Sequence, residues 1–156
     1  MENIAQKIMA WDNAAVVFGR HYAAPFSRFS VFLIYFWFGA LKVWGLSPAN
    51  PLVATLLSKT LPFISPESFF IALGVFEMVV GLMFIIPRLT RLGIFFIALH
   101  FITAMLPLFV LPAISWQGFL TPTLEGQYMI KNILILALVL NILSHRHPFG
   151  TEVKNV

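Results

Sequence analysis

Cysteine is absent from the chain of 156 residues, and charged residues make up only 10% of it. Without cysteine there can be no disulfide relay, thiolate nucleophile, iron–sulfur cluster or covalently attached c-type haem. The scarcity of charge accompanies 60% hydrophobic residues and a mean hydropathy of +0.90. This composition is typical of an integral membrane protein and excludes an ordinary soluble domain.

Acidic residues are also few: there are six of them against ten Lys and Arg, which leaves a net charge of +4. The basic residues gather at the ends of hydrophobic segments, as orientation signals do, so the small excess indicates no nucleic-acid partner. The N-terminus has no basic region followed by a compact apolar core and a small-residue cleavage site, so no cleavable signal peptide is predicted. Internal repeats and low-complexity segments are absent as well.

One acid stands in the middle of a hydrophobic segment, and the chain is organised around it. The segment runs from about Phe69 to Ile86 and can cross a hydrocarbon core of roughly 30 Å. Glu77 lies near its midpoint, where a carboxylate costs about 2.5–3.5 kcal/mol. Glu77 must therefore be protonated, paired or in contact with water. Gly74 and Gly81 share its helical face, where small residues let another helix approach closely.

Four hydrophobic segments are long enough to cross the membrane as helices, and they occupy residues of about 29–44, 69–86, 92–111 and 124–144. The connection between the second and third is very short, so these two are expected to form an antiparallel hairpin. Pro107 is expected to kink the third span. The sequence thus predicts an all-α fold, in which residues 1–156 form a single integral membrane domain, a four-helix bundle.

Two further helices are predicted outside the spans. Residues 1–24 are too polar to span, but their apolar residues recur at steps of four and three, which predicts an amphipathic helix lying in the membrane interface. A helix docked on a soluble partner is the alternative. Between the first two spans, Asn50-Pro51 predicts an N-cap and the start of a short helix on the outer membrane surface. Ser65 is the expected cap of the second span.

The basic residues are distributed unevenly between the two sides of the predicted bundle. Seven fall on one side, namely Lys7, Arg20, Arg28, Arg88, Arg91, Arg146 and Lys154. Those that fall toward the other side are Lys42, Lys59 and Lys131. By the positive-inside rule, both termini are expected in the cytoplasm and the two long loops outside.

Ionisable side chains occur in all four spans. At about 1.5 Å per residue, Glu77 and His100 lie near mid-depth, and Lys42 and Lys131 lie in the outer part of the membrane. Uncharged polar side chains accompany them on the same spans, namely Tyr35, Tyr128 and Asn132. If these faces converge, the seven side chains form an intramembrane polar pocket open toward the outside, and they are the candidate ligand-binding residues.

The histidines do not favour a metal cofactor. A transmembrane b-type haem needs axial ligands that face one another across the bundle, and only His100 lies inside a span, so haem is not expected. His21, His145 and His147 fall at the cytoplasmic edge with no acid or thiol beside them, which is typical of a solvated interface and predicts no metal site. The sequence contains no Ser-His-Asp set, phosphate-binding loop or paired carboxylates.

Several motifs together resemble those of one family, and they are Phe36-Trp37-Phe38-Gly39-Ala40-Leu41-Lys42, Gly74-Val75-Phe76-Glu77, Arg91-Leu92-Gly93, and Gly126-Gln127-Tyr128 with Lys131-Asn132. In these motifs the chain resembles the DoxX-like family of small four-helix membrane proteins, particularly the branch associated with reactive-chlorine resistance. The resemblance implies a bacterial inner-membrane protein. Because some relatives are subunits of quinone-linked oxidoreductases, it also implies a membrane or periplasmic partner subunit, or a homo-oligomer.

Three interpretations of the polar side chains stay open. The first is structural or assembly-related: an ion pair from Glu77 to a lysine, or a hydrogen bond to His100, fixes the register of the helices. The second is a site for a quinone or a similar lipophilic carbonyl compound, hydrogen-bonded by His100 or Glu77 and packed by aromatic rings. Candidate rings are Phe36, Phe76 and Phe96. The third is proton-coupled transport through Glu77 and His100. An enzymatic role would be that of a quinone-linked oxidoreductase subunit.

Overall fold

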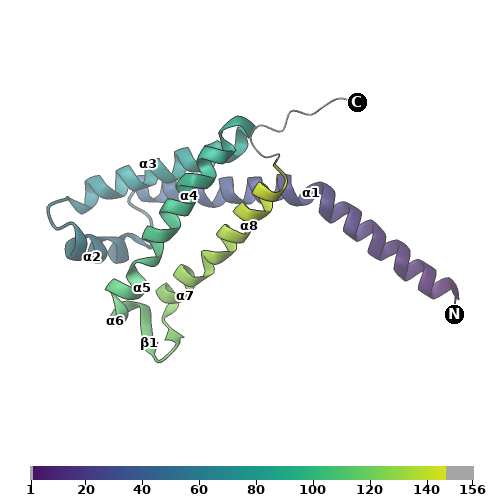
Figure 1. Cartoon of the computed structure of the whole chain (residues 1–156). Helices are drawn as coiled ribbons and strands as arrows, with labels where there is room; N and C mark the ends of the chain where they lie inside the picture. Colours follow the sequence, from purple (N-terminus) through teal and green to yellow (C-terminus); the bar gives the residue numbers. More distant parts are fainter. Residues whose placement is uncertain (1, 147–156) are drawn as a thin grey trace.

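The computed structural model describes residues 2–146 and is almost entirely helical (Figure 1). The elements in chain order are α1 (Glu2–Val43), α2 (Asn50–Thr60), α3 (Pro66–Ile85), the 3-10 turn η1 (Pro87–Leu89), α4 (Thr90–Met105), α5 (Pro107–Val110), α6 (Pro112–Ser115), the strands β1 (Trp116–Gly118) and β2 (Thr121–Pro122), α7 (Leu124–Lys131) and α8 (Ile133–Ser144). His147 and Lys154, assigned above to the cytoplasmic edge, lie outside the described residues.

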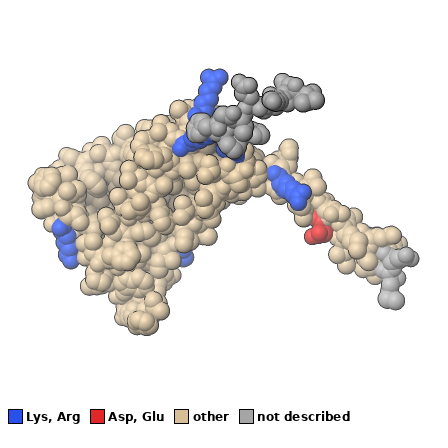
Figure 2. Space-filling model, viewed as in Figure 1, with Lys and Arg blue, Asp and Glu red and all other residues tan. Residues whose placement is uncertain are grey.

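Four helical segments of the described chain are long and apolar enough to cross a membrane, and they are Asn3–Val43, Pro66–Ile85, Pro87–Val110 and Leu124–Ser144. The all-α class and the four membrane helices are thereby confirmed. Large apolar side chains cover the outside of the bundle; Phe95 is 62% exposed and Leu140 57%. Figure 2 shows one face of the molecule: charged side chains are visible at a few places, and most of the bundle surface carries no charge. Such an exterior fits a lipid bilayer.

α1 differs from the expected arrangement of two separate helices. The sequence predicts an interfacial helix over residues 1–24 and a first span over about 29–44, but one helix continues through both. Residues 3–22 are all exposed, and in Figure 1 this part of α1 projects away from the bundle. Pro25 lies inside the helix, just before the first buried residue, Ser27. A proline removes only one backbone hydrogen bond and bends a helix rather than ending it when both sides remain helical.

The bundle is held most closely together where α1 crosses α3. A Cβ atom added to Gly39 would lie 2.6 Å from the carbonyl oxygen of Gly74, and the converse distance is also 2.6 Å. A Cβ on Gly81 would lie 3.0 Å from the backbone nitrogen of Phe36. The close approach expected at Gly74 and Gly81 is therefore confirmed. The core around this contact consists of Val31, Tyr35, Val80, Phe84, Ile97, Val139 and Ile142.

The turn η1 returns α4 antiparallel to α3, as the short connection predicts (Figure 1). Pro107 interrupts the third span as expected. α4 ends at Met105, α5 begins at Pro107, and the intervening Leu106 donates its backbone N–H to the carbonyl of Thr103 at 3.2 Å. The fourth span is also divided, because Asn132 separates α7 from α8.

Two helix starts test the predicted caps. Ser65 is the N-cap of α3, and its hydroxyl oxygen accepts from the backbone N–H of Ser68 at 3.4 Å. The N-cap predicted at Asn50 is wrong: Ala49 holds that position, and Asn50 is already helical. The reason is local, because the Asn50 N–H donates to the carbonyl of Ser47 at 3.1 Å and so begins the turn one residue early.

Candidate functional site

Four of the predicted polar side chains form one connected network inside the bundle. Lys42 on α1 donates a hydrogen bond from Nζ to Oε2 of Glu77 on α3, at 2.6 Å. His100 on α4 places Nε2 3.3 Å from Oε1 of the same carboxylate. Its other ring nitrogen, Nδ1, lies 3.0 Å from the hydroxyl oxygen of Tyr35 on α1. One carboxylate and one imidazole thereby join three helices.

The glycine contact between α1 and α3 positions this network. Tyr35, Gly39 and Lys42 are spaced by four and three residues, so they lie on one face of α1. Glu77 follows Gly74 by three residues and shares its face of α3. Because the two backbones meet at the glycines, Glu77 reaches Lys42 directly. A lysine near a span end can also extend its ammonium to the membrane surface, but Lys42 turns toward Glu77 instead.

The network is shielded from its surroundings. Glu77 is 5% exposed, Lys42 8% and Tyr35 6%, whereas the His100 side chain is 18% exposed. A buried ion pair is tolerated when its geometry is good and its remaining polar atoms are hydrogen-bonded. Both carboxylate oxygens of Glu77 have partners. Of the three states open to Glu77 from the sequence, the structure shows the paired one.

One assignment of protons satisfies every group in the network. Lys42 is charged, Glu77 is ionised, and His100 is neutral with its proton on Nε2, donating to Oε1. The Tyr35 hydroxyl then donates to Nδ1. The network has no net charge in this state, which keeps the energy of burying it low.

Aromatic rings lie close to the imidazole. The Phe76 ring centroid lies 6.0 Å from that of His100, and Phe96 packs edge-on against Phe76 at 5.8 Å. Two of the three rings expected to form an aromatic wall are thus at the site. The third, Phe36, instead packs against Phe32 on α1, with 5.4 Å between the ring centroids.

The other three candidate residues do not join the network. Tyr128 is 63% exposed, and the Lys131 ammonium lies 5.5 Å from the Tyr128 ring centroid on the outside of α7. Asn132 is half-buried at the break between α7 and α8. Helical spacing explains this, because the buried residues of α7 are Gly126 and Met129. At about 100° per residue, Tyr128 and Lys131 point away from that face and Asn132 lies beside it.

A second polar contact was not expected from the sequence. Asn141 on α8 donates from Nδ2 to the Ser27 hydroxyl oxygen on α1 at 2.9 Å. The signal that could have revealed it is the single amide in the otherwise apolar run of Ile133–Ser144, since a polar side chain in a membrane helix usually faces another helix. This contact ties the fourth span to the first.

The fold and the network together define the class of the protein: an all-α, multi-pass membrane protein whose first three spans share a buried ionic and hydrogen-bonded network. Comparisons of the chain with protein-family models, with curated proteins and with solved structures gave no match.

Proposed function

We propose that the protein is a small membrane subunit that binds a quinone or a similar lipophilic carbonyl compound beside His100, in a redox- or stress-linked role. The observation that carries the proposal is the continuous path from Lys42 through Glu77 and His100 to Tyr35. Its most exposed side chain is the imidazole, so a molecule dissolved in the lipid meets the network there. Phe76 and Phe96 offer it aromatic packing.

The chemistry of the network suits such a ligand. Carbonyl oxygens of a quinone accept hydrogen bonds, and they gain negative charge and then protons when the quinone is reduced. His100 is the group that would donate a hydrogen bond to such an oxygen, with its Nε2–H turned from Glu77 toward the ligand. The Tyr35 hydroxyl, which lies 3.0 Å from Nδ1, would replace a proton that the ring gives up, and the Glu77 carboxylate would stay an acceptor for Nε2. Electrons would come from a partner subunit, in agreement with the resemblance to DoxX-like proteins.

A structural function is the second candidate, and one observation favours it. Both oxygens of Glu77 are already bonded within the protein, directly beside the tight Gly39–Gly74 contact. A network that only fixes helix register would look the same. The two functions predict different quinone binding for a variant that removes the charge of Glu77 but keeps the shape of its side chain.

Glu77→Gln and His100→Ala are therefore expected to reduce quinone binding by about tenfold or more, since a hydrogen bond to a charged group is worth about 1.5–3 kcal/mol. Membrane abundance is measured alongside for both variants and retention is expressed per folded protein, because Glu77→Gln keeps the volume and one acceptor for Lys42 but loses the charge of the pair. The measurement is mass spectrometry of quinone retained by purified protein in nanodiscs, together with survival of cells under oxidative chlorine stress.

Tyr128→Phe and Lys131→Gln are the matched controls, because both side chains are exposed and outside the network. They should leave quinone retention unchanged. If Glu77→Gln and His100→Ala also retain quinone and survival at normal abundance, the network is structural and the quinone proposal is wrong.

We further propose that the protein lies in the bacterial inner membrane with both termini in the cytoplasm. The support is the gathering of Arg28, Arg88, Arg91 and Arg146 at one end of the spans. Since the chain has no cysteine, single cysteines act as clean reporters. Cysteine at Lys59 or Phe119 should react with an impermeant maleimide added to intact cells, and cysteine at Arg88 should react only after lysis. The reverse pattern would show the opposite orientation.

A further inference from the structure

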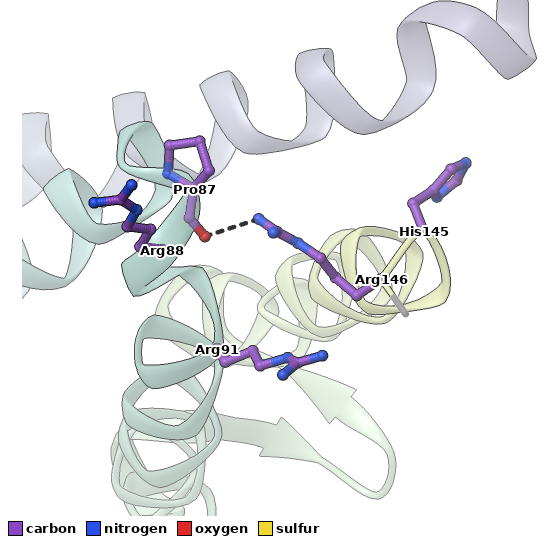
Figure 3. A pocket seen from close by; sticks show the side chains of 5 residues that line it. All are labelled: Pro87, Arg88, Arg91, His145 and Arg146. Atoms are coloured by element: carbon purple, nitrogen blue, oxygen red, sulfur yellow. Dashed lines mark hydrogen bonds between the residues drawn. The ribbon is translucent and has the colours of Figure 1, made fainter. Parts of the chain in front are cut away.

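A basic hollow lies at the end of the bundle where three spans terminate. The described residues that line it are Pro87, Arg88, Arg91, His145 and Arg146, and its volume is about 390 Å³. They come from η1, from the first turn of α4 and from the residues just after α8. In Figure 3, Arg146 and Arg91 extend across the space between the turn and α8, and Arg88 and His145 extend outward at its two sides.

Arg146 is held in place by groups that do not neutralise it. Its Nη2 donates to the carbonyl of Pro87 at 3.1 Å and to the hydroxyl of Thr90 at 2.9 Å. Thr90 is fully buried, so this anchor is part of the packed bundle. Because both acceptors are uncharged, the guanidinium keeps its full charge and some of its N–H donors for a further ligand.

Acids of the described chain are placed elsewhere. Glu2 and Asp12 belong to the projecting part of α1, and Glu67 and Glu125 stand at the N-terminal starts of α3 and α7, at the opposite end of the bundle. Glu77 is inside the network with Lys42. None of these five lines the hollow, and the sixth acid, Glu152, lies outside the described residues. Among the described residues, the lining therefore contains basic side chains and no acid.

Apolar side chains stand next to the arginines. Ile85 and Ile86 precede Pro87 in the chain and are 48% and 46% exposed, Leu89 is 38% exposed, and Leu143 on the last turn of α8 is 43% exposed. A site for a small soluble anion would not need these exposed apolar side chains beside it. A lipid needs both parts, because its phosphate meets the arginines at the membrane surface and its chains lie along the apolar ends of the spans.

We propose that this hollow binds the phosphate of an anionic phospholipid headgroup. Basic recesses between membrane helices at the level of the headgroups are suited to such lipids. Arg146 supplies a fixed guanidinium, and Arg88 and Arg91 add charge from the adjacent turn. Bound in this way, the lipid would connect the α3–α4 turn to the end of α8, which the Arg146 contacts already bring together.

The test uses the full-length protein in mild detergent and measures lipid retention by native mass spectrometry. Phosphatidylglycerol is the probe, and phosphatidylcholine, whose phosphate is balanced by its choline so that it has no net charge, is the reference. Wild-type protein should retain phosphatidylglycerol preferentially. Arg88→Gln and Arg146→Gln should each weaken this retention about fivefold, the effect of one basic residue near a membrane surface. Arg20→Gln is the matched control, because it removes the same charge from an exposed position on the projecting part of α1, and it should change nothing.

Each other outcome overturns the proposal in a distinct way. An equal loss with Arg20→Gln would mean that only the overall charge attracts lipid. Displacement of the lipid by millimolar inorganic phosphate would mean that the site takes a free anion. Arg146→Gln removes two internal hydrogen bonds and could unfold this end, so Arg88→Gln decides the matter: Arg88 is exposed and forms no hydrogen bond with the described residues. Unchanged retention in Arg88→Gln would reject the site.

Discussion

Replacing Glu77 by lysine is expected to abolish the accumulation of folded protein in the membrane. The substitution removes the carboxylate that joins Lys42 to His100 and places a second ammonium within the same buried space. Loss of one partner of a buried pair typically costs about 3–5 kcal/mol, and repulsion between the two lysines adds to this. The measurement is the fraction of a fluorescent fusion that elutes as a single folded species in mild detergent.

The matched variant is the exchange Lys42→Glu with Glu77→Lys, which restores one charge of each sign at the same two positions. It should recover a substantial part of the folded fraction, although His100 would then face an ammonium. The double replacement Lys42→Met with Glu77→Leu should change stability only modestly, because it removes both charges of the pair and leaves neither one buried without a partner. If Glu77→Lys folds as well as the wild type, the side chain at position 77 faces water or a membrane surface and the pairing is not important.

Gly74→Leu is expected to lower the thermal unfolding temperature strongly and to separate α1 from α3. Even a Cβ atom at this position would lie 2.6 Å from the Gly39 carbonyl oxygen, a backbone atom that cannot move aside alone. Forcing extra atoms into a packed contact costs about 1–3 kcal/mol even where side chains can yield. The displaced helix would also carry Glu77 away from Lys42, so the loss of packing and the loss of the ion pair should add.

Gly19→Leu is the control for this prediction. Gly19 lies in the projecting part of α1, and a Cβ atom there would have no neighbour within 4 Å. The substitution makes the same chemical change and should leave the unfolding temperature in detergent essentially unaltered. Equal unfolding temperatures for Gly74→Leu and Gly19→Leu would show that α1 and α3 do not depend on their glycine contact.

The spans and the centre of the network could be predicted because strong physical constraints act on them. A hydrophobic run of membrane length leaves little choice of structure, and an acid at its midpoint needs a partner. Tyr35, Lys42 and His100 followed from helical spacing and depth. Spacing along a helix gives the relative direction of side chains, but it does not give the direction of the helix as a whole. Lys131 and Tyr128 lie outside the network for this reason, since α7 turns Gly126 and Met129 inward.

Local details were less accessible from the sequence. Asn50 is a residue type that commonly caps helices. Its backbone N–H donates to the carbonyl of Ser47, however, so the helix begins one residue earlier, with Ala49 as the N-cap. The sequence predicts separate helices over residues 1–24 and about 29–44, whereas α1 continues through Pro25 between them. In both cases the backbone conformation of the neighbouring residues decides where the helix begins or continues, and the residue type alone does not.

The Lys42–Glu77 pair also has a consequence for biosynthesis. Its two residues are 35 positions apart, so α1 emerges from the ribosome well before α3. At a synthesis rate of about 5–20 residues per second, Glu77 is made roughly 2–7 s after Lys42. During this time its position next to the end of α1, at Val43, lets the long side chain reach the lipid headgroups. Glu77 then enters the bilayer after the Lys42 ammonium is already in place. Because α1 precedes α3 in the chain, Glu77 has a partner of opposite charge when it enters the membrane.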